Sequence, residues 1–209
     1  LCEEWFDIAK QSCNSVYLNT QDNHSFIKDI SGLNYRLTGE VIGAADEVVP
    51  MILKGGGIKN TLIISPPGAG KTTMLRDIVR QLSYKSYRVS VVDERSEIAA
   101  LCEGRSAFDL GFSTDVLEGV DKADGMLMVL RSMSPDVIVT DEIGKQSDID
   151  AIERITNSGA AVIATIHGRN IDMIKRRDDL KRMLKFFDLI ITLSKRKGIG
   201  TVEEALTEW

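Results

Sequence analysis

Short apolar runs alternate with amphipathic stretches along most of this chain. The runs have the length and composition of buried strands, and the stretches between them repeat apolar residues every three or four positions, as helices do. Strands are predicted at 61–64, 87–93, 137–140 and 161–166, and helices at 43–53, 72–82, 122–133 and 149–156. Strands that alternate with helices in this way predict an α/β domain with a mainly parallel sheet.

Other segments break this alternation and are assigned separately. They are predicted to be a short helix at 96–102, an irregular stretch at 108–115 with a turn at Gly111, one or two basic helices within 170–187, and a closing hairpin formed by 188–193 and 200–203 across Lys197-Gly198.

The sequence Ser65-Pro-Pro-Gly-Ala-Gly-Lys-Thr-Thr73 separates the first of these strands from the following helix. Strand, glycine-containing loop and helix form the context of a phosphate-binding loop, in which N–H groups at the helix start meet a polyphosphate. Lys71 is expected to reach the β- and γ-phosphates of ATP, and the Thr72 hydroxyl to bind Mg²⁺. A coincidental turn is the alternative, and the Lys-Thr pair argues against it. The predicted nucleotide-binding residues are Ser65, Pro66, Pro67, Gly68, Ala69, Gly70, Lys71, Thr72 and Thr73.

The strand predicted at 137–140 ends in the acids Asp141 and Glu142. In a parallel sheet with a phosphate loop, that end of the strand lies beside the triphosphate. We therefore expect Asp141 to hold Mg²⁺ through its water shell and Glu142 to polarise the attacking water. Many strands end in acids, so the argument depends on the phosphate loop upstream.

A second acid cluster, Asp93, Glu94 and Glu97, follows the strand at 87–93. Carboxylates this close together are costly unless a cation or a basic group compensates their charge. Mg²⁺ with its waters would do so, and a solvated loop is the alternative.

His167 ends the strand at 161–166, where it is placed to sense the γ-phosphate or the catalytic water by a hydrogen bond. A satisfied polar residue without a catalytic role is the alternative. Arg131 and Arg169 are expected to flank the same edge and to supply charge to the transition state, from the same or a neighbouring subunit.

Composition adds limits to this picture. With 209 residues, of which 43% are hydrophobic, the chain can bury one α/β core with a small appendage. The net charge of −5 argues against a broad nucleic-acid-binding surface. Residues 169–197 nevertheless carry ten Lys/Arg against four Asp/Glu, a basic segment that would face a membrane, an acidic partner, a neighbouring subunit or only solvent.

Three cysteines without metal-ligand spacing suit reduced thiols in a cytosolic protein, and no apolar run reaches the length of a membrane span.

The N-terminal part has a different pattern. Residues 1–16 repeat apolar positions at helical spacing, and 26–30 and 33–37 resemble brief extended pieces. Because the chain begins at Leu1 rather than Met, we expect a fragment. We predict that residues 1–38 are the remnant of a small, incomplete N-terminal domain with its linker, and that residues 39–209 form the phosphate-loop ATPase domain.

The stretches SPPGAGKTT, VVDERSEIA, RSMSPDVIVTDEIG and ATIHG together resemble the stage III sporulation protein AA family of endospore-forming bacteria. Those proteins are relatives of the type II and type IV secretion ATPases, and the resemblance covers roughly 31–203. It implies a RecA/AAA-like P-loop NTPase core. The aspartate box of the secretion ATPases corresponds to Asp93, Glu94 and Glu97, and their histidine box to His167. Secretion ATPases usually have Gly-Glu where this chain has Asp141-Glu142, which implies that this chain binds its metal ion differently from them.

From the residue patterns and this resemblance together we expect catalytic roles for Lys71, Glu142, His167, Glu94, Glu97 and Arg131, and metal binding by Thr72, Asp141 and Asp93. The resemblance also implies an ATP-hydrolysing motor of a secretion-like channel between mother cell and forespore. The expected assembly is a hexamer at the inner face of the mother-cell membrane, in the cytoplasm, with membrane proteins of the sporulation complex as partners and no nucleic acid.

Other functions remain open on the sequence alone. A RecA-like nucleic-acid motor would show DNA-stimulated hydrolysis, but the acidic charge and the lack of an aromatic and basic stripe count against it. A nucleotide-gated scaffold with little turnover is the other alternative. The presence of Lys71, Thr72, Asp141 and Glu142 argues against such a scaffold.

Overall fold

The computed structural model describes residues 40–209, so the segments predicted at 1–16, 26–30 and 33–37 lie outside it. The strands are β1 (Thr61–Ser65), β2 (Val89–Asp93), β3 (Leu101–Cys102), β4 (Arg105–Ser106), β5 (Thr114–Glu118), β6 (Val137–Thr140), β7 (Ala161–His167), β8 (Leu189–Ser194) and β9 (Thr201–Leu206). The helices are α2 (Val49–Ile52), α3 (Lys71–Tyr84), α4 (Lys122–Ser132), α5 (Gln146–Ser158), α6 (Ile171–Lys175), α7 (Asp178–Lys181) and the 3₁₀ helix η2 (Arg182–Phe186).

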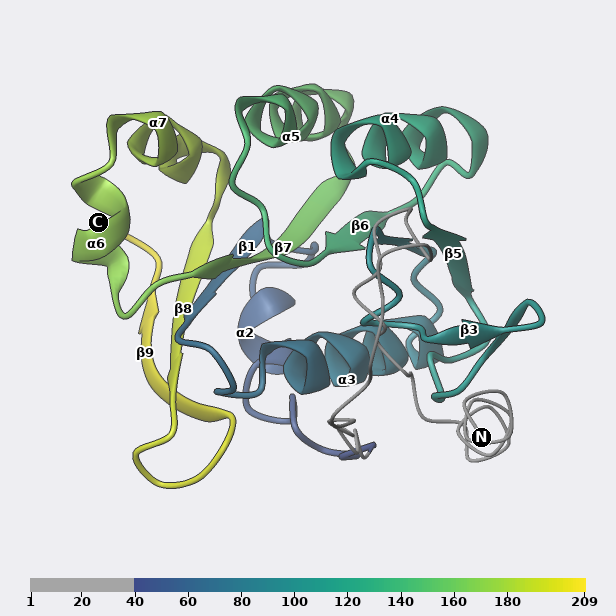
Figure 1. Cartoon of the computed structure of the whole chain (residues 1–209), viewed down its shortest axis with the longest axis horizontal. Helices are drawn as coiled ribbons and strands as arrows, with labels where there is room; N and C mark the ends of the chain where they lie inside the picture. Colours follow the sequence, from purple (N-terminus) through teal and green to yellow (C-terminus); the bar gives the residue numbers. More distant parts are fainter. Residues whose placement is uncertain (1–39) are drawn as a thin grey trace, which may run out of the picture. The chain divides into compact units, whose positions relative to one another are not determined.

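Within the described residues, a seven-stranded sheet with the order β5-β2-β6-β7-β1-β8-β9 forms the centre of the fold. All neighbouring strands in it are parallel except β8 and β9, which are antiparallel. Helices α4, α5 and α7 cover one face of this sheet, and α2 and α3 cover the other (Figure 1). The α/β class and the mainly parallel sheet predicted from the sequence are confirmed.

Successive side chains of each strand enter different cores, because they point to opposite faces of the sheet. On β1, Leu62 and Ile64 pack in the core under α4 and α5, whereas Ile63 packs in the core that includes α3. All three side chains are fully buried. Burial on both faces is why the central strands have continuous apolar sequences rather than alternating ones.

Two predicted helices differ from the structure. Of the helix expected at 43–53, only α2 (Val49–Ile52) is α-helical, and turns precede it. The N–H of Ala45 donates to Asp77 Oδ2 on α3 at 2.8 Å, so that segment is fixed by a tertiary contact rather than by a helical ladder. The helix predicted at 96–102 is wrong, because the chain turns there and then forms the strand β3. The closing hairpin is confirmed as β8 and β9.

The sheet order brings separate parts of the sequence to one edge. Strands β2, β6, β7 and β1 are consecutive neighbours and parallel, so their carboxyl ends lie side by side. At these ends are Asp93, Asp141, His167 and Ser65, with Ser65 directly opposite His167 in the register. This edge is where ligands bind in open α/β sheets.

Candidate nucleotide site

The phosphate loop joins β1 directly to α3. Gly68 and Gly70 have φ of 68° and 92°, a left-handed conformation that glycine adopts without steric cost. Gly70 is the N-cap of α3, and the helix begins at Lys71. The first N–H groups of a helix have no intrahelical acceptor, so those of α3 are available to an anion at the loop. Thr72 and Thr73 lie half-buried in this first turn.

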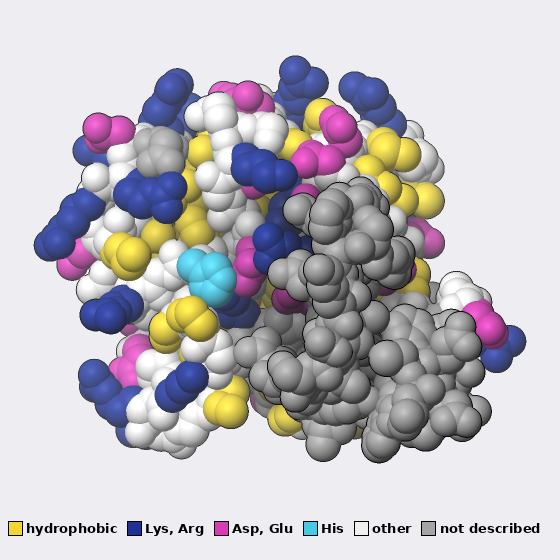
Figure 2. All heavy atoms as spheres, in the orientation of Figure 1, with side chains coloured by type: hydrophobic (Ala, Val, Ile, Leu, Met, Phe, Trp, Pro, Cys, Tyr) yellow, Lys and Arg dark blue, Asp and Glu magenta, His cyan; other side chains and the backbone are white. Residues whose placement is uncertain are grey.

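Lys71, Glu142 and His167 meet at the end of the phosphate loop. The Nζ of Lys71 lies 3.3 Å from Glu142 Oε1 and 2.9 Å from His167 Nδ1. His167 Nε2 lies 2.7 Å from the same Glu142 oxygen. Lys71 is buried, whereas half of the His167 side chain is exposed, and it is seen in cyan on the surface in Figure 2. The structure therefore brings together three residues that lie far apart in the sequence.

Glu142 is held in position by its backbone as well as by its side chain. Its φ of 41° is left-handed, which is strained for a residue with a side chain, and its N–H donates to Thr165 Oγ1 at 2.9 Å. Arg95 Nη1 lies 3.1 Å from its Oε2. Burial alone would raise the pKa of Glu142, but Lys71, then His167 and Arg95, together hold it below its usual value. The side chain is therefore an ionised carboxylate near neutral pH.

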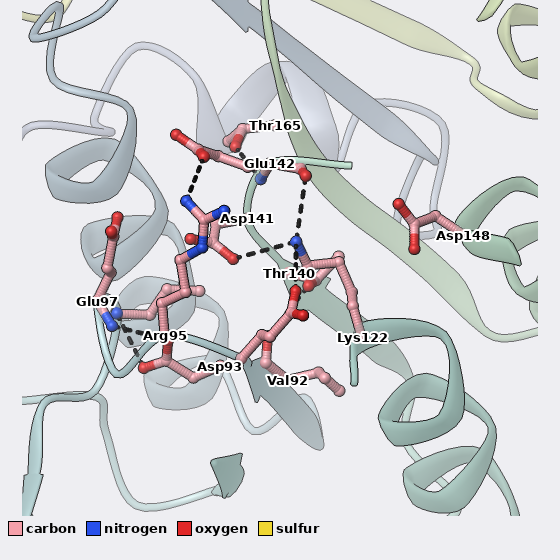
Figure 3. A network of polar contacts seen from close by, with 12 residues as sticks. Val92, Asp93, Arg95, Glu97, Lys122, Thr140, Asp141, Glu142, Asp148 and Thr165 are labelled. Carbon is pink, nitrogen blue, oxygen red and sulfur yellow. Dashed lines mark hydrogen bonds and ion pairs between the residues drawn. The ribbon is translucent and has the colours of Figure 1, made fainter. Parts of the chain in front are cut away.

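Asp141 is the candidate for the magnesium site. Its side chain is buried, and neither of its oxygens accepts a hydrogen bond from the described residues. Lys122 Nζ lies 3.6 Å from Oδ1 (Figure 3). Burial, and after it the charges of Asp93 and Glu142, raise the pKa of Asp141 despite that lysine. A buried carboxylate that accepts no hydrogen bond from the described residues fits a role in holding a hydrated cation.

Magnesium bound beside a phosphate loop usually has waters and phosphate oxygens among its ligands. Within residues 40–209, no group of three His, Cys, Asp or Glu side chains lies close enough together to bind a metal ion. This agrees with the chemistry of Mg²⁺, which keeps several waters and takes one or two protein ligands together with phosphate oxygens. Thr72 and Asp141 fit that limited role.

The negative charge of the acid cluster, Asp93, Glu94 and Glu97, is compensated mainly by other protein groups. The Asp93 carboxylate is fully buried and accepts the backbone N–H groups of residues 97–99 at 2.8 to 2.9 Å, which explains the turn found there in place of a helix. Glu94 lies 3.5 Å from Lys122 and 3.7 Å from Lys145. These contacts make Asp93 a weaker candidate for metal binding than Asp141, and its metal role stays a prediction.

Glu97 differs from its two neighbours in the cluster. Burial, followed by the charges of Asp141 and Glu142, raises the pKa of its carboxyl group. Figure 3 shows its side chain beside the loop that carries Arg95. A raised pKa next to two further acids fits proton or cation exchange at this site. The catalytic roles of Glu94 and Glu97 stay predictions.

The placement of Arg131 differs from expectation. Arg131 lies in the last turn of α4, whose first residue, Lys122, contacts the acids. Nine residues of helix span about 14 Å, so Arg131 lies toward the opposite edge of the sheet. The expectation that it flanks the same edge as His167 is therefore wrong. Its catalytic role stays a prediction. Arg169 follows His167 closely and is exposed.

Sequence reasoning missed Lys122 and Thr165 of this site, as well as Arg95, which contacts Glu142. Lys122 is 4% exposed, and its Nζ contacts Asp141, Glu94 and the backbone oxygen of Glu142 (Figure 3). The positive charge of a lysine in the first turn of a helix is unfavourable beside the positive end of the helix dipole. Such a lysine therefore indicates acidic partners on other elements. Thr165 is a polar residue inside an apolar strand, and such a residue needs a hydrogen-bond partner when buried.

The described fold matches solved P-loop ATPases. The Legionella pneumophila ATPase DotB aligns with a TM-score of 0.56 at 20% identity, over 77% of this chain and 47% of that one. The pilus retraction motor PilT, solved with bound ADP, aligns with a TM-score of 0.55 at 20% identity, over 76% of this chain and 49% of that one. The chain thus has the fold of the P-loop secretion and pilus ATPases.

The sequence places the chain more narrowly within this class. The family model described as Sporulation stage III, protein AA matches residues 15–208, and the chain belongs to that family. Stage III sporulation protein AA of Bacillus subtilis (strain 168) is 39% identical over 185 residues. The matched region covers 85% of this chain and 60% of that protein, so the chain spans less than two thirds of its relative's length.

Proposed function

We propose that this protein hydrolyses ATP and is the motor subunit of a secretion-like channel complex between mother cell and forespore. The observation that carries the proposal is the contact of Glu142 with both Lys71 and His167 beside the phosphate loop. These contacts support the proposal, because they bring a carboxylate, a lysine and a histidine together beside the loop in which we expect the phosphates of the nucleotide to bind. Membership of the sporulation family supports the proposal that the protein acts during endospore formation.

In this proposal Lys71 has two alternative partners. Without nucleotide it forms an ion pair with Glu142, and with ATP in the loop it turns to the β- and γ-phosphates. Glu142 then keeps His167 and Arg95 as neighbours and orients the attacking water. Its low pKa favours orienting and polarising that water over complete removal of a proton. Mg²⁺, bound with Thr72 and Asp141, would neutralise charge on the phosphates.

His167→Ala is expected to lower ATP turnover by about ten-fold to a hundred-fold, because the hydrogen bond that orients Glu142 and senses the γ-phosphate is lost. The affinity for ADP, which has no γ-phosphate, should change little. Phosphate release and ADP titration measured on the same preparation check both expectations. An equal loss of ADP affinity, or a lower melting temperature as the main effect, would return His167 to a structural role.

The proposed assembly is a hexamer that binds membrane proteins of the sporulation complex from the mother-cell cytoplasm. In residues 40–209 no helix is both long and apolar enough to cross a bilayer. Lys and Arg side chains gather on the side of the molecule formed by α6, α7 and the β8–β9 hairpin (Figure 2). This basic side is the candidate contact with the acidic remainder of a neighbouring subunit.

If subunits share the site, turnover per subunit should rise with protein concentration, because an arginine supplied in trans raises turnover by several orders of magnitude. High salt should weaken the association by screening the charges. In mixtures, Lys71→Ala subunits, which keep Arg131 and Arg169, should restore some activity to subunits that lack these arginines. Specific activity that stays flat over a wide concentration range, without complementation in mixtures, would contradict a shared site.

A further inference from the structure

The tip of the β8–β9 hairpin, residues 195–200, lies against the phosphate loop. The N–H of Gly200 donates to the backbone oxygen of Ala69 at 3.0 Å. A Cβ added to Gly70 would lie 2.8 Å from Ile199 Cγ2 and 3.2 Å from the Gly200 nitrogen. The first distance is shorter than real Cβ contacts and the second is unusually tight, so a residue without a Cβ at position 70 is what lets the hairpin tip lie this close to the loop. Ile199 and Gly200 of the tip therefore lie against the phosphate loop.

Lys195 points from this tip to the loop. Its Nζ would lie 2.9 Å from a Cβ added to Gly68, in the middle of the phosphate loop. Among residues 40–209 no carboxylate lies within ion-pair distance of Lys195, whereas its neighbour Arg196 has Glu203 at 3.5 Å. An ammonium group with no carboxylate partner among the described side chains thus lies beside a loop whose backbone N–H groups also attract an anion. Both features are satisfied together by a bound polyphosphate.

We propose that Lys195 is a second phosphate-binding lysine of the nucleotide site, supplied by the hairpin tip across about 130 residues of sequence from the loop. The inference rests on the proposed function, because the anion is the polyphosphate of ATP or ADP. The loop cradles the inner phosphates. Lys195 beside Gly68 should therefore contribute to the binding of ADP as well as ATP, unlike His167, whose proposed contact is with the γ-phosphate.

Lys195→Ala is expected to raise the dissociation constants of fluorescently labelled ADP and ATP by about ten-fold, the lower end of what a charged hydrogen bond contributes. Lys195→Arg should retain most of the affinity, because it keeps the positive charge. Lys197→Ala is the matched control: it removes another exposed lysine from the same tip and should bind nucleotide as the wild type does. The melting temperature without nucleotide should be the same in all three variants.

The outcomes separate this inference from the proposed function. If Lys71→Ala loses nucleotide binding while Lys195→Ala and Lys197→Ala bind equally well, the inference is overturned and nucleotide binding stands. The same conclusion follows if Lys195→Ala and Lys197→Ala weaken binding equally, since the effect is then one of overall charge. A wild-type protein that binds neither labelled ADP nor ATP overturns both proposals.

Discussion

Lys71→Ala is expected to remove ATP binding and turnover together, with a loss of affinity of roughly a hundred-fold or more. Lys71 is buried at the end of the phosphate loop, and its ammonium group lies 3.3 Å from Glu142. Alanine leaves the β- and γ-phosphate charges without that partner. Titration with labelled ATP and a phosphate-release assay measure the two effects separately.

The control for this variant lies on the same helix. Lys85 follows the last residue of α3 and is exposed, at the end of the helix opposite the phosphate loop. Lys85→Ala removes the same charge without touching the site, so its ATP affinity should equal that of the wild type. Wild-type affinity in Lys71→Ala would show that the loop does not bind triphosphate in the proposed manner.

The parallel sheet was predictable because its central strands are buried on both faces. Residues 137–140 and 161–166 are continuous apolar runs, and such runs leave little choice other than central strands. The phosphate loop then fixed which edge of the sheet carries the chemistry. From that edge the positions of Asp141, Glu142 and His167 followed without any further information.

What could not be predicted depends on contacts between distant segments. The chain turns at 96–102 because the buried Asp93 carboxylate captures three backbone N–H groups, a contact that helical periodicity does not reveal. Arg131 was misplaced because the sequence shows that α4 exists but not which end of it reaches the acids. The hairpin tip at Lys195 lies on Gly68 only because β8 pairs with β1.

Glu142→Gln is expected to bind ATP and to hydrolyse it about a hundred-fold to a thousand-fold more slowly than the wild type. The amide keeps the size of the side chain but loses the charge that orients the attacking water. Binding should be retained or become tighter, because the ion pair that holds Lys71 at 3.3 Å from the carboxylate no longer competes with the phosphates. Affinity is measured with labelled ATP, and turnover by phosphate release at saturating ATP.

Glu153→Gln supplies the matched control for that variant. Glu153 lies on the exposed side of α5, 3.9 Å from Lys185, and the substitution removes the same charge away from the phosphate loop. Its turnover and affinity should both equal those of the wild type, because exposed ion pairs contribute little. A slow Glu142→Gln that still binds ATP separates the water-orienting role of this carboxylate from its contact with Lys71. Unchanged turnover in Glu142→Gln would instead mean that another acid beside the loop, such as the buried Asp141 or Glu97, orients the water.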